Sequence, residues 1–357
     1  MRAKPDSLIR PAIRALSAYH VPDPVKGIKL DAMENPYRWP DTLVNEWLER
    51  LRMVEVNRYP DPAARRLRGR LRTVMGVPEG TGILLGNGSD ELIQMIALAV
   101  CEPGRTILCP GPTFVMYRMI AAGTGMQYIR VPLGRDYAID GEAMRSAIDR
   151  YKPAVIFLAD PNHPTGNLFA ATEIHTILEY APGLVVVDEA YAPFTDASFL
   201  SALERHDNLL VLRTLSKMGL AGLRLGWLAG APHWLDEFDK IRLPYNISIL
   251  DQVSGEFALD HLSVFEAQAQ EIRRERARLF GALQSLEGIS PCPSEANFIL
   301  FRVPAGRAGE LHARLKDRGI LIKNLDGADP DLADCLRVTV GLAEENRSFI
   351  EALRDSL

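Results

Sequence analysis

The amino-acid sequence predicts an α/β fold built on a mostly parallel sheet, and three observations support this prediction. The 357 residues are 47% apolar and 24% charged, which is typical of a globular chain. At ~150 residues per domain, the length fits two domains. In the middle of the chain, short apolar runs alternate with amphipathic stretches, and several runs are uninterrupted, as in strands buried on both faces of a parallel sheet.

The expected strands of this sheet lie between residues 82 and 228. They are Gly82–Leu85, Thr106–Cys109, Tyr128–Val131, Ala154–Ala159, Leu184–Val187, Leu209–Arg213 and Gly226–Leu228. Amphipathic stretches such as Asp90–Val100 and Thr172–Tyr180 separate many of them and predict helices. Because strands and helices alternate, we expect a seven-stranded α/β sheet with helices on both faces.

The pattern changes after about residue 245 and predicts a second, smaller domain. Leu262–Leu286 forms one long amphipathic stretch. The shorter elements expected with it are a strand at Ile28–Met33, a strand at Phe298–Val303, a helix at Gly309–Arg318, and strands at Ile320–Lys323 and Leu336–Val340. We therefore predict a large domain at residues 46–245 and a discontinuous small α+β domain from residues 1–45 and 246–357.

Composition and motifs exclude several functional classes. A net charge of −5 gives no basic footprint, so no nucleic-acid partner is expected. The longest apolar runs are about seven residues, too short to span a membrane, and the N-terminus does not resemble a secretory signal. The four cysteines form no C-x-x-C pair and no H-E-x-x-H occurs, so we expect no metal site and a reducing, cytoplasmic location.

The clearest chemical signal is a lysine among small residues. Lys217 follows an expected strand and lies in TLSKMGLAGLRLG, where glycine and alanine are close by. Small residues let the backbone approach a flat ring, which an ordinary surface lysine does not need. Thr214, Ser216 and Arg224 in the same segment could hold a phosphate. Lys217 is therefore a candidate catalytic lysine, with a surface lysine as the alternative.

A carboxylate precedes this lysine in the motif VVVDEAY. Asp188 lies at the carboxyl end of an expected strand, where α/β sheets bind ligands, although a helix-start aspartate is an equal alternative. Paired with Lys217, it indicates pyridoxal-phosphate chemistry, which needs a lysine to form a Schiff base and a carboxylate to keep the pyridine nitrogen protonated. Tyr191 could then donate to the phenolic oxygen of the ring.

A glycine turn supplies a possible anion site. GNGSDE places Gly88 and Ser89 between a strand and a helix, where free backbone N–H groups can meet a phosphate. By itself this motif is more often a plain turn. The chain lacks both G-x-x-x-x-G-K-[ST] and G-x-G-x-x-G, which disfavours a nucleoside triphosphatase and a dinucleotide-binding enzyme.

Six motifs occur together in an order typical of one enzyme family. They are GNGSDE, PGPTF, PNHPTGN, VVVDEAY, TLSKMGLAGLRLG and CLRVTVG, across residues 86–341. The chain resembles the fold-type I pyridoxal-phosphate aminotransferases and, within them, the histidinol-phosphate aminotransferases. LDAMENPY and NRYPDP fit the same family, so that the resemblance covers nearly the whole chain. It implies pyridoxal 5'-phosphate as cofactor and a homodimer with shared active sites.

The resemblance also implies a role for each matching residue. The implied catalytic residues are Lys217, Asp188 and Tyr191. The residues implied to contact the cofactor ring are Phe114, by stacking, and Asn162 or His163, by donation to the ring oxygen. The residues implied to hold the cofactor phosphate are Gly88, Ser89, Thr214, Ser216 and Arg224, with Tyr59 reaching the cofactor of the neighbouring subunit. The residues implied to bind substrate are Arg337, Lys323 and Tyr37.

The chain departs from the family pattern at three places. Asn162-His163-Pro164 stands where the family usually has two asparagines before the proline, and a histidine there titrates near neutrality. Many relatives place the phosphate-binding arginine one residue further from the lysine than Arg224, so the intervening segment is expected to turn more tightly. Lys323 stands where many relatives have an arginine, which puts the substrate in question more than the reaction.

The implied reaction is transamination between L-histidinol phosphate and 2-oxoglutarate, giving imidazole-acetol phosphate and L-glutamate in histidine biosynthesis. The alternatives on the same fold are an aminotransferase for aromatic or other amino acids and a decarboxylase of a phosphorylated amino acid. A non-catalytic binding protein is a further alternative. The joint presence of Lys217, Asp188 and Arg224 disfavours it, because binding alone needs no Schiff-base lysine.

Overall fold

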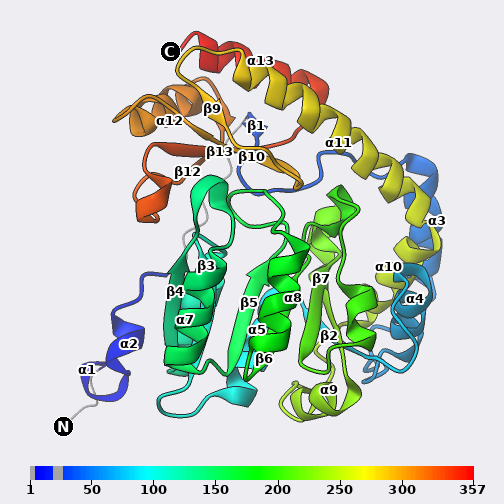
Figure 1. The fold of residues 1–357 in the computed structure, drawn as a ribbon. Helices are drawn as coiled ribbons and strands as arrows, with labels where there is room; N and C mark the ends of the chain where they lie inside the picture. The colour runs from blue at the N-terminus through cyan, green and yellow to red at the C-terminus, as the bar shows by residue number, and fades with distance from the viewer. Residues whose placement is uncertain (1–4, 19–26) are drawn as a thin grey trace.

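A seven-stranded sheet forms the centre of the molecule (Figure 1), with strand order β2-β8-β7-β6-β5-β3-β4. The computed structural model describes residues 5–18 and 27–357. The strands are β2 (Gly82–Asn87), β3 (Thr106–Gly111), β4 (Gln127–Pro132), β5 (Val155–Ala159), β6 (Leu184–Asp188), β7 (Leu209–Thr214) and β8 (Leu225–Gly230). Only β8 runs antiparallel to its neighbours, β2 and β7. The predicted mostly parallel seven-stranded sheet is therefore confirmed.

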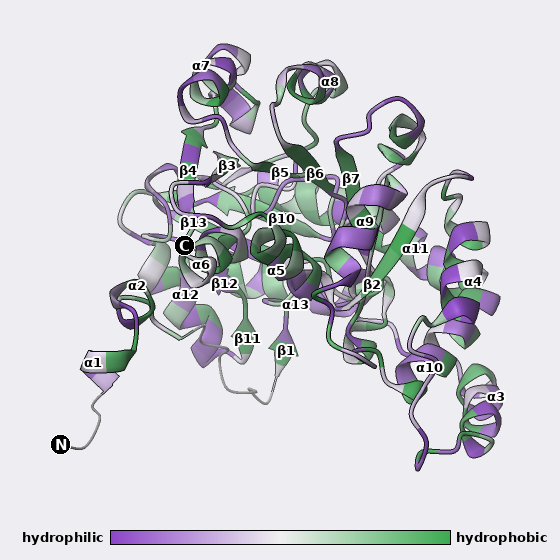
Figure 2. Ribbon diagram, turned by 90° about the horizontal axis from the view of Figure 1, so that it is seen from below, coloured by the Kyte–Doolittle hydropathy of each residue, from purple (hydrophilic) through white to green (hydrophobic). Residues whose placement is uncertain are grey.

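The uninterrupted apolar strands are explained by burial on both faces. Along β6, Val185 and Val187 pack into one buried cluster, whereas Leu184 and Val186 pack into another on the opposite face. In Figure 2 the strands β5, β6 and β7 are largely hydrophobic, whereas the outer helix α3 (Asp41–Arg52) carries both polar and apolar residues. Because side chains alternate across a strand, each face requires its own layer of helices.

Helices cover both faces of the sheet. The helices whose buried residues join the first cluster include α3, α4 (Arg65–Met75), α7 (Gly141–Tyr151), α8 (Ala171–Tyr180) and α10 (Ile249–Asp260). Those that join the second are α5 (Ser89–Val100), α6 (Val115–Thr124) and α9 (Pro232–Asp239). Shorter helical segments are α1 (Pro5–Leu8), α2 (Pro11–Arg14), η1 (Arg135–Tyr137), η2 (Ala192–Phe194), η3 (Leu200–Glu204), η4 (Ser216–Met218), η5 (Ala221–Leu223) and η6 (Pro330–Leu332).

A smaller α+β unit lies over the carboxyl edge of the large sheet (Figure 1). Its four-stranded antiparallel sheet has the order β12-β13-β10-β9, and β1 pairs with β11 in a separate parallel pair. The strands are β1 (Ile28–Lys29), β9 (Ser290–Pro291), β10 (Phe298–Arg302), β11 (Ile320–Leu321), β12 (Lys323–Asn324) and β13 (Cys335–Thr339). The helices are α11 (Leu262–Gln284), α12 (Ala308–Asp317) and α13 (Ala343–Arg354).

Two expected strands of this unit differ from the structure. The single strand expected at residues 320–323 is two short strands, because β11 pairs with β1 whereas β12 pairs with β13. The strand expected at residues 28–33 ends at Lys29. It does not continue because the backbone changes partner at Leu30, which donates its N–H to the Leu321 carbonyl at 2.8 Å but accepts at its carbonyl from the Thr339 N–H of β13 at 2.8 Å. Further on, Met33 has a φ of 53° and donates its backbone N–H to the hydroxyl of Thr339.

Packing bears on the domain division expected at residues 45 and 245. Leu43 of α3, expected in the small domain, belongs to the same buried cluster as Leu225 of the large sheet, so we propose that the large domain begins before it. Phe257 and Phe265 belong to the same buried cluster as Leu225 of the large sheet. The buried residues of α11 join the small unit's cluster only from Ala269 onward. We therefore propose that the large domain extends past residue 245 into the first turns of α11.

An ion pair joins the far edge of the large sheet to the small unit. Arg130 of β4 donates from Nε to Asp329 Oδ2 at 3.0 Å and from Nη2 to Asp329 Oδ1 at 2.8 Å. It also pairs with Asp331, which lies in η6. Two parallel bonds between a guanidinium and a carboxylate fix orientation as well as distance. The edge strand β4 is thereby held directly to the segment before β13.

The reversal of β8 positions a ten-residue connection, residues 215–224, at the sheet edge. Leu215 N–H donates to the Leu225 carbonyl at 2.9 Å, and the Thr214 hydroxyl donates to the same oxygen at 3.1 Å. Gly219 has a φ of 113°, a backbone conformation that side chains disfavour. The connection therefore stays at the end of β7, beside the end of β6.

None of the helices in the described part of the chain has the length and apolar character that a membrane crossing requires.

We predict that Gly226→Ala destabilises the protein by about 1–3 kcal/mol, because overpacking of a close contact displaces the backbone. A Cβ at this position would lie 2.6 Å from both Gly88 C and Ser89 N. Gly222→Ala is the matched control, since a Cβ there meets nothing within 4 Å. Urea denaturation of both variants measures the free energies of unfolding. Equal values for the two variants would contradict the close contact.

Candidate active site

One pocket at the carboxyl edge of the parallel strands gathers most of the predicted site residues. Its empty volume, open mouth included, is about 570 Å³. The predicted residues that line it are Ser89, Phe114, His163, Asp188, Tyr191, Ser216, Lys217 and Arg224. Met33, Asp90, Ala159 and Ala190 complete the lining. Motifs spread over more than a hundred residues meet here because the parallel strands end at the same edge.

Lys217 lies in η4, within the connection between β7 and β8. Its Nζ is 5.7 Å from the centroid of the Tyr191 ring. Burial, followed by the positive charges of Arg337 and Arg224, lowers the pKa of Lys217 to about 8. About one tenth of this amine is therefore uncharged at pH 7, a far larger share than for an ordinary lysine. An uncharged amine is the form that attacks a carbonyl carbon.

Asp188 ends β6 and is nearly inaccessible to solvent. Its Oδ2 accepts a hydrogen bond of 2.7 Å from the Tyr117 hydroxyl, and its Oδ1 accepts one of 3.1 Å from the Ala190 backbone N–H. Burial raises the pKa of Asp188 to about 6, against the opposing effect of these two hydrogen bonds. An anionic carboxylate at this place is stabilised when it meets a cation, such as a protonated ring nitrogen.

Tyr117 is a site residue that the sequence analysis missed. It is fully buried in α6, and its ring stacks on Phe157 at a centroid distance of 4.7 Å. Its position three residues after Phe114 was an available signal, because residues at i and i+3 share one face of a helix. Tyr117 therefore orients Asp188 from the layer beneath the pocket.

A compact cradle lies at the start of α5. Gly88 has a φ of 79°, and a Cβ there would lie 2.5 Å from Nη2 of Arg224, so the guanidinium packs against bare backbone. The Thr214 and Ser216 hydroxyls are 2.9 Å apart, and Ser216 N–H donates to the Thr214 hydroxyl at 3.1 Å. Hydroxyls, a guanidinium and a helix N-terminus in one place form a cradle suited to a phosphate.

The structure places His163, and not Asn162, at the pocket. Asn162 is fully buried, and its amide donates to the Pro112 carbonyl at 3.0 Å and to the Thr165 hydroxyl at 2.7 Å. Both N–H groups of Asn162 are thus used within the protein. The His163 ring lies parallel to that of Tyr191 at a centroid distance of 6.3 Å, and edge-on to Phe114 at 5.4 Å.

His163 does not titrate near neutrality, so that expectation is wrong. Burial, followed by the nearby charges of Arg337, Lys217 and Lys323, lowers the pKa of His163 well below its usual value. Both effects disfavour protonation of the imidazole, because its positive charge would be buried beside other cations. The imidazole is therefore neutral at physiological pH.

The cationic end of the site comes from the small unit. Arg337 and Lys323 are register partners on β13 and β12. Arg337 is 3% exposed, and it donates from Nη2 to the Asp31 carbonyl at 2.9 Å and from Nη1 to Nε2 of His163. Neither Arg337 nor Lys323 lines the pocket directly, but the charges of both reach His163, which does. Two neighbouring cations at this end are suited to an anionic substrate group.

Tyr59 and Tyr37 are two further predicted residues that do not line this pocket. Tyr59 is 80% exposed and stacks on Tyr245 at a centroid distance of 4.4 Å. Tyr37 packs against the small unit's cluster near α11, where burial and the charges of Glu271 and Glu275 raise the pKa of its phenol. The roles proposed for these two residues are therefore not supported by contacts within one chain.

Comparisons with known proteins agree with this geometry. The model of the family described as "Aminotransferase class I and II" matches residues 25–353. The chain belongs to this family. Among its relatives, histidinol-phosphate aminotransferase 2 of Nitrosococcus oceani is 57% identical, over 97% of this chain and 96% of that protein. Histidinol-phosphate aminotransferase 1 of Ralstonia nicotianae is 50% identical, over 98% of this chain and 94% of that protein.

A solved structure shares the fold. Histidinol-phosphate aminotransferase from Sinorhizobium meliloti, in complex with pyridoxal-5'-phosphate, superposes with a TM-score of 0.88 over 98% of this chain and 97% of that chain. At 24% identity, this likeness supports the fold alone. The predicted fold class, a fold-type I aminotransferase with a large α/β domain and a small α+β domain, is confirmed.

Enzymes of this family use pyridoxal phosphate, and the residues of the pocket fit that group. The bare backbone of Gly88 lets the Arg224 guanidinium lie against the start of α5, and Ser216, whose hydroxyl bonds that of Thr214, lines the same pocket as Arg224, so these groups are suited to the cofactor's phosphate. The buried carboxylate of Asp188 is suited to a pyridinium nitrogen, and the part-neutral amine of Lys217 to the aldehyde carbon. Asp90 Oδ1 and His163 Nδ1 are buried here without a hydrogen-bond partner among the described residues.

We predict that Asp188→Asn stabilises the cofactor-free protein at neutral pH, by an amount of the order of 2 kcal/mol. Because burial raises the pKa of Asp188 to about 6, the folded state binds a proton more tightly than the unfolded chain, whose carboxyl titrates near 3.9. That contribution is complete below about pH 4 and is lost as pH rises through about 6. An amide does not titrate, so the variant loses this pH dependence.

Denaturant titrations of the cofactor-free protein at several pH values measure this effect. The variant should also bind the cofactor more weakly, because the pyridinium nitrogen loses its counter-charge. The exposed Asp207→Asn is the matched control and should change neither property. Parallel pH profiles for the Asp188 variant and the unaltered protein would contradict the raised pKa.

Proposed function

We propose that this chain transfers the amino group of L-histidinol phosphate to 2-oxoglutarate, giving imidazole-acetol phosphate and L-glutamate. The proposal depends on one arrangement: a buried Lys217 shares a pocket with the carboxylate of Asp188 and is close enough to Arg337, the register partner of Lys323, for that charge to lower its pKa. The names of the relatives supply the substrate, and histidine biosynthesis is the process that such a transfer serves.

The amine of Lys217 carries the proton transfers of this reaction. When bound, pyridoxal phosphate supplies an electron sink for the electron pair left on the substrate's α-carbon. Lys217 Nζ would take the proton from the substrate's α-carbon and would pass it to the carbon of the cofactor that bears the transferred nitrogen. A general base works best when its pKa is near the working pH, and a value of about 8 meets this condition.

Asp188 and its partners hold the proton on the pyridine nitrogen. The negative charge of Asp188 stabilises that proton, and the Tyr117 hydroxyl and the Ala190 N–H keep the carboxylate in one orientation. Tyr191 and Phe114 provide aromatic walls beside the pocket. These groups are in place before substrate arrives, so no reorganisation is needed during the reaction.

The cationic end accounts for both substrates of a ping-pong exchange. Histidinol phosphate carries a phosphate and no carboxylate, whereas glutamate carries two carboxylates. Arg337 can bind either anion in a bidentate manner, and Lys323 adds a point charge suited to the more highly charged phosphate. One cationic site thus serves two differently shaped anions in turn.

We also propose that the chain forms a homodimer. Several large apolar side chains are exposed on two adjacent segments, at residues 48–59 and 241–250. They are Leu48, Met53, Val56, Tyr59, Ile241, Leu243, Tyr245 and Leu250. The ring stack of Tyr59 on Tyr245 joins the two segments. An exposed apolar patch of this kind is typical of a protein–protein interface.

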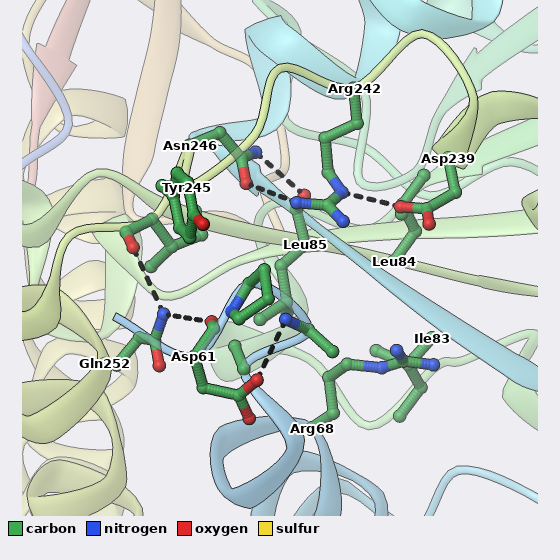
Figure 3. A pocket seen from close by; sticks show the side chains of 14 residues that line it. Asp61, Arg68, Ile83, Leu84, Leu85, Asp239, Arg242, Tyr245, Asn246 and Gln252 are labelled. Carbon is green, nitrogen blue, oxygen red and sulfur yellow. Dashed lines mark hydrogen bonds and ion pairs between the residues drawn. The ribbon is translucent and has the colours of Figure 1, made fainter. Parts of the chain in front are cut away.

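Polar contacts hold the segment that follows Tyr59 against the one that carries Tyr245 (Figure 3). The Gln252 amide donates to the Asp61 carbonyl at 3.0 Å and to the Ile247 carbonyl at 3.1 Å. The Asn246 amide donates to the Leu85 carbonyl of β2 at 3.2 Å. The patch is thereby fixed relative to the sheet that carries the active site, which supports Tyr59 as a contributor to the neighbouring subunit's site.

We also propose that the protein is located in the cytoplasm. All four cysteines, Cys101, Cys109, Cys292 and Cys335, are free thiols in the structure. Free cysteines are typical of proteins from reducing compartments.

We predict that Lys323→Ala raises the KM for histidinol phosphate by ~10–150-fold, because a charge-assisted contact to phosphate is worth ~1.5–3 kcal/mol. The KM for an unphosphorylated aromatic donor should change little. Steady-state kinetics with both donors measure this split, and Lys316→Ala on the exposed face of α12 is the matched control. If the unaltered enzyme used phenylalanine or tyrosine as fast as histidinol phosphate, an aromatic aminotransferase would replace this proposal.

We predict that two inactive variants recover activity when their subunits exchange. In a mixed dimer of Tyr59→Ala and Lys217→Ala, one site receives an intact Lys217 and an intact Tyr59, and the other carries both lesions. Random exchange should restore about one quarter of the unaltered activity, since half of the dimers are mixed and each has one intact site. Activity is measured before and after exchange, which differently tagged chains verify. Verified exchange without recovery would argue against shared sites.

A further inference from the structure

The two ring nitrogens of His163 have unlike surroundings. Nε2 lies within hydrogen-bond reach of Nη1 of Arg337. A guanidinium has only donors, so the imidazole must accept this bond through an unprotonated Nε2. Because the ring is neutral, its single proton is then on Nδ1. The tautomer of His163 thus follows from the identity of its partner.

Nδ1 is buried and has no hydrogen-bond partner among residues 5–18 and 27–357. A buried N–H donor without an acceptor costs free energy, so such a group in a binding pocket indicates an acceptor supplied by the ligand. The rings beside His163 are those of Phe114, Tyr191 and Phe298. The pocket that His163 shares with Lys217 is where a ligand acceptor would be.

We propose that Arg337 holds His163 as the Nδ1–H tautomer, so that Nδ1 donates a hydrogen bond to the phenolic oxygen of pyridoxal phosphate. Nδ1 is three bonds from Cα, as is the amide nitrogen of an asparagine, so a histidine can present a donor at the same reach. Nε2, on the far side of the ring, contacts Arg337. One rigid ring therefore links the cofactor to the residue proposed to bind the substrate's anionic group.

Every charged group that faces this ring favours the neutral form. Arg337 faces it from β13, Lys323 from β12 and Lys217 from the connection after β7, and the charge of each disfavours protonation of the ring. The donor is therefore present over the whole working pH range. A neutral amide at position 163 should replace it well, whereas a ring without nitrogen should not. The proposal rests on the cofactor named in the proposed function but not on histidinol phosphate as substrate.

Nitrogen-15 NMR of histidine-labelled protein tests the tautomer directly, without turnover. The chain has seven histidines, and the signal that disappears in His163→Asn identifies His163. In the unaltered protein, with and without cofactor, we expect the proton on Nδ1. In Arg337→Met, which removes the donor to Nε2, we expect the proton to move largely to Nε2, the position that free imidazole side chains prefer. A proton on Nε2 in the unaltered protein would overturn the proposal.

The pH titration of the bound cofactor's absorbance tests the hydrogen bond. A donor to the phenolic oxygen stabilises the extra negative charge of the deprotonated cofactor. His163→Phe keeps a ring but removes the donor, so the midpoint should rise by about 1–2 pH units, a change of about 10–100-fold in the proton affinity. His163→Asn should titrate close to the unaltered enzyme.

These measurements separate this proposal from the proposed function. A phenylalanine variant that titrates like the unaltered enzyme would exclude the hydrogen bond, whatever the substrate is. Conversely, a failure to use histidinol phosphate would leave both the tautomer and the titration unchanged. If His163→Phe does not fold, the NMR of the unaltered protein still decides between the two tautomers.

Discussion

The antiparallel return of β8 beside β7 is the constraint on which the site depends. A parallel strand would require a long crossover over one face of the sheet. The antiparallel strand instead needs only the connection at residues 215–224, which stays at the carboxyl edge. Lys217 thus lies next to the end of β6, where Asp188 is. At the other end of the connection, Arg224 reaches Gly88 because β8 also pairs with β2.

The large sheet could be predicted from sequence because its strands are buried on both faces. Continuous apolar runs such as Leu184–Val187 are then required, and they are easy to distinguish from the amphipathic helices between them. The small unit was harder, because its strands are short and separate. Residues 320–324 read as one run, yet they join two different sheets, and pairing of this kind depends on segments such as Ile28–Lys29 that are distant in the chain.

The site residues likewise divide into those that the sequence predicts and those that only the structure shows. Lys217, Asp188 and the glycine turn could be predicted because each lies in a local motif with its own chemical logic. The contact between Arg337 and His163 could not, because the two residues are 174 positions apart and neither motif refers to the other. The same holds for Tyr117, whose role depends on a bond to Asp188 across 71 positions. The choice between Asn162 and His163 required the direction of each side chain, which spacing does not determine.

The bidentate pair between Arg130 and Asp329 constrains how the two units can move. It fastens the edge strand β4 to the segment before β13, the strand that carries Arg337. On the opposite side of the molecule, the long helix α11 continues from the large unit's buried cluster into that of the small unit. A rotation that widened the pocket mouth would keep both attachments only if its axis passed close to them. The small unit is therefore expected to rock about a line from β4 to α11, which would carry the cationic end toward and away from the lysine without separating the two cores.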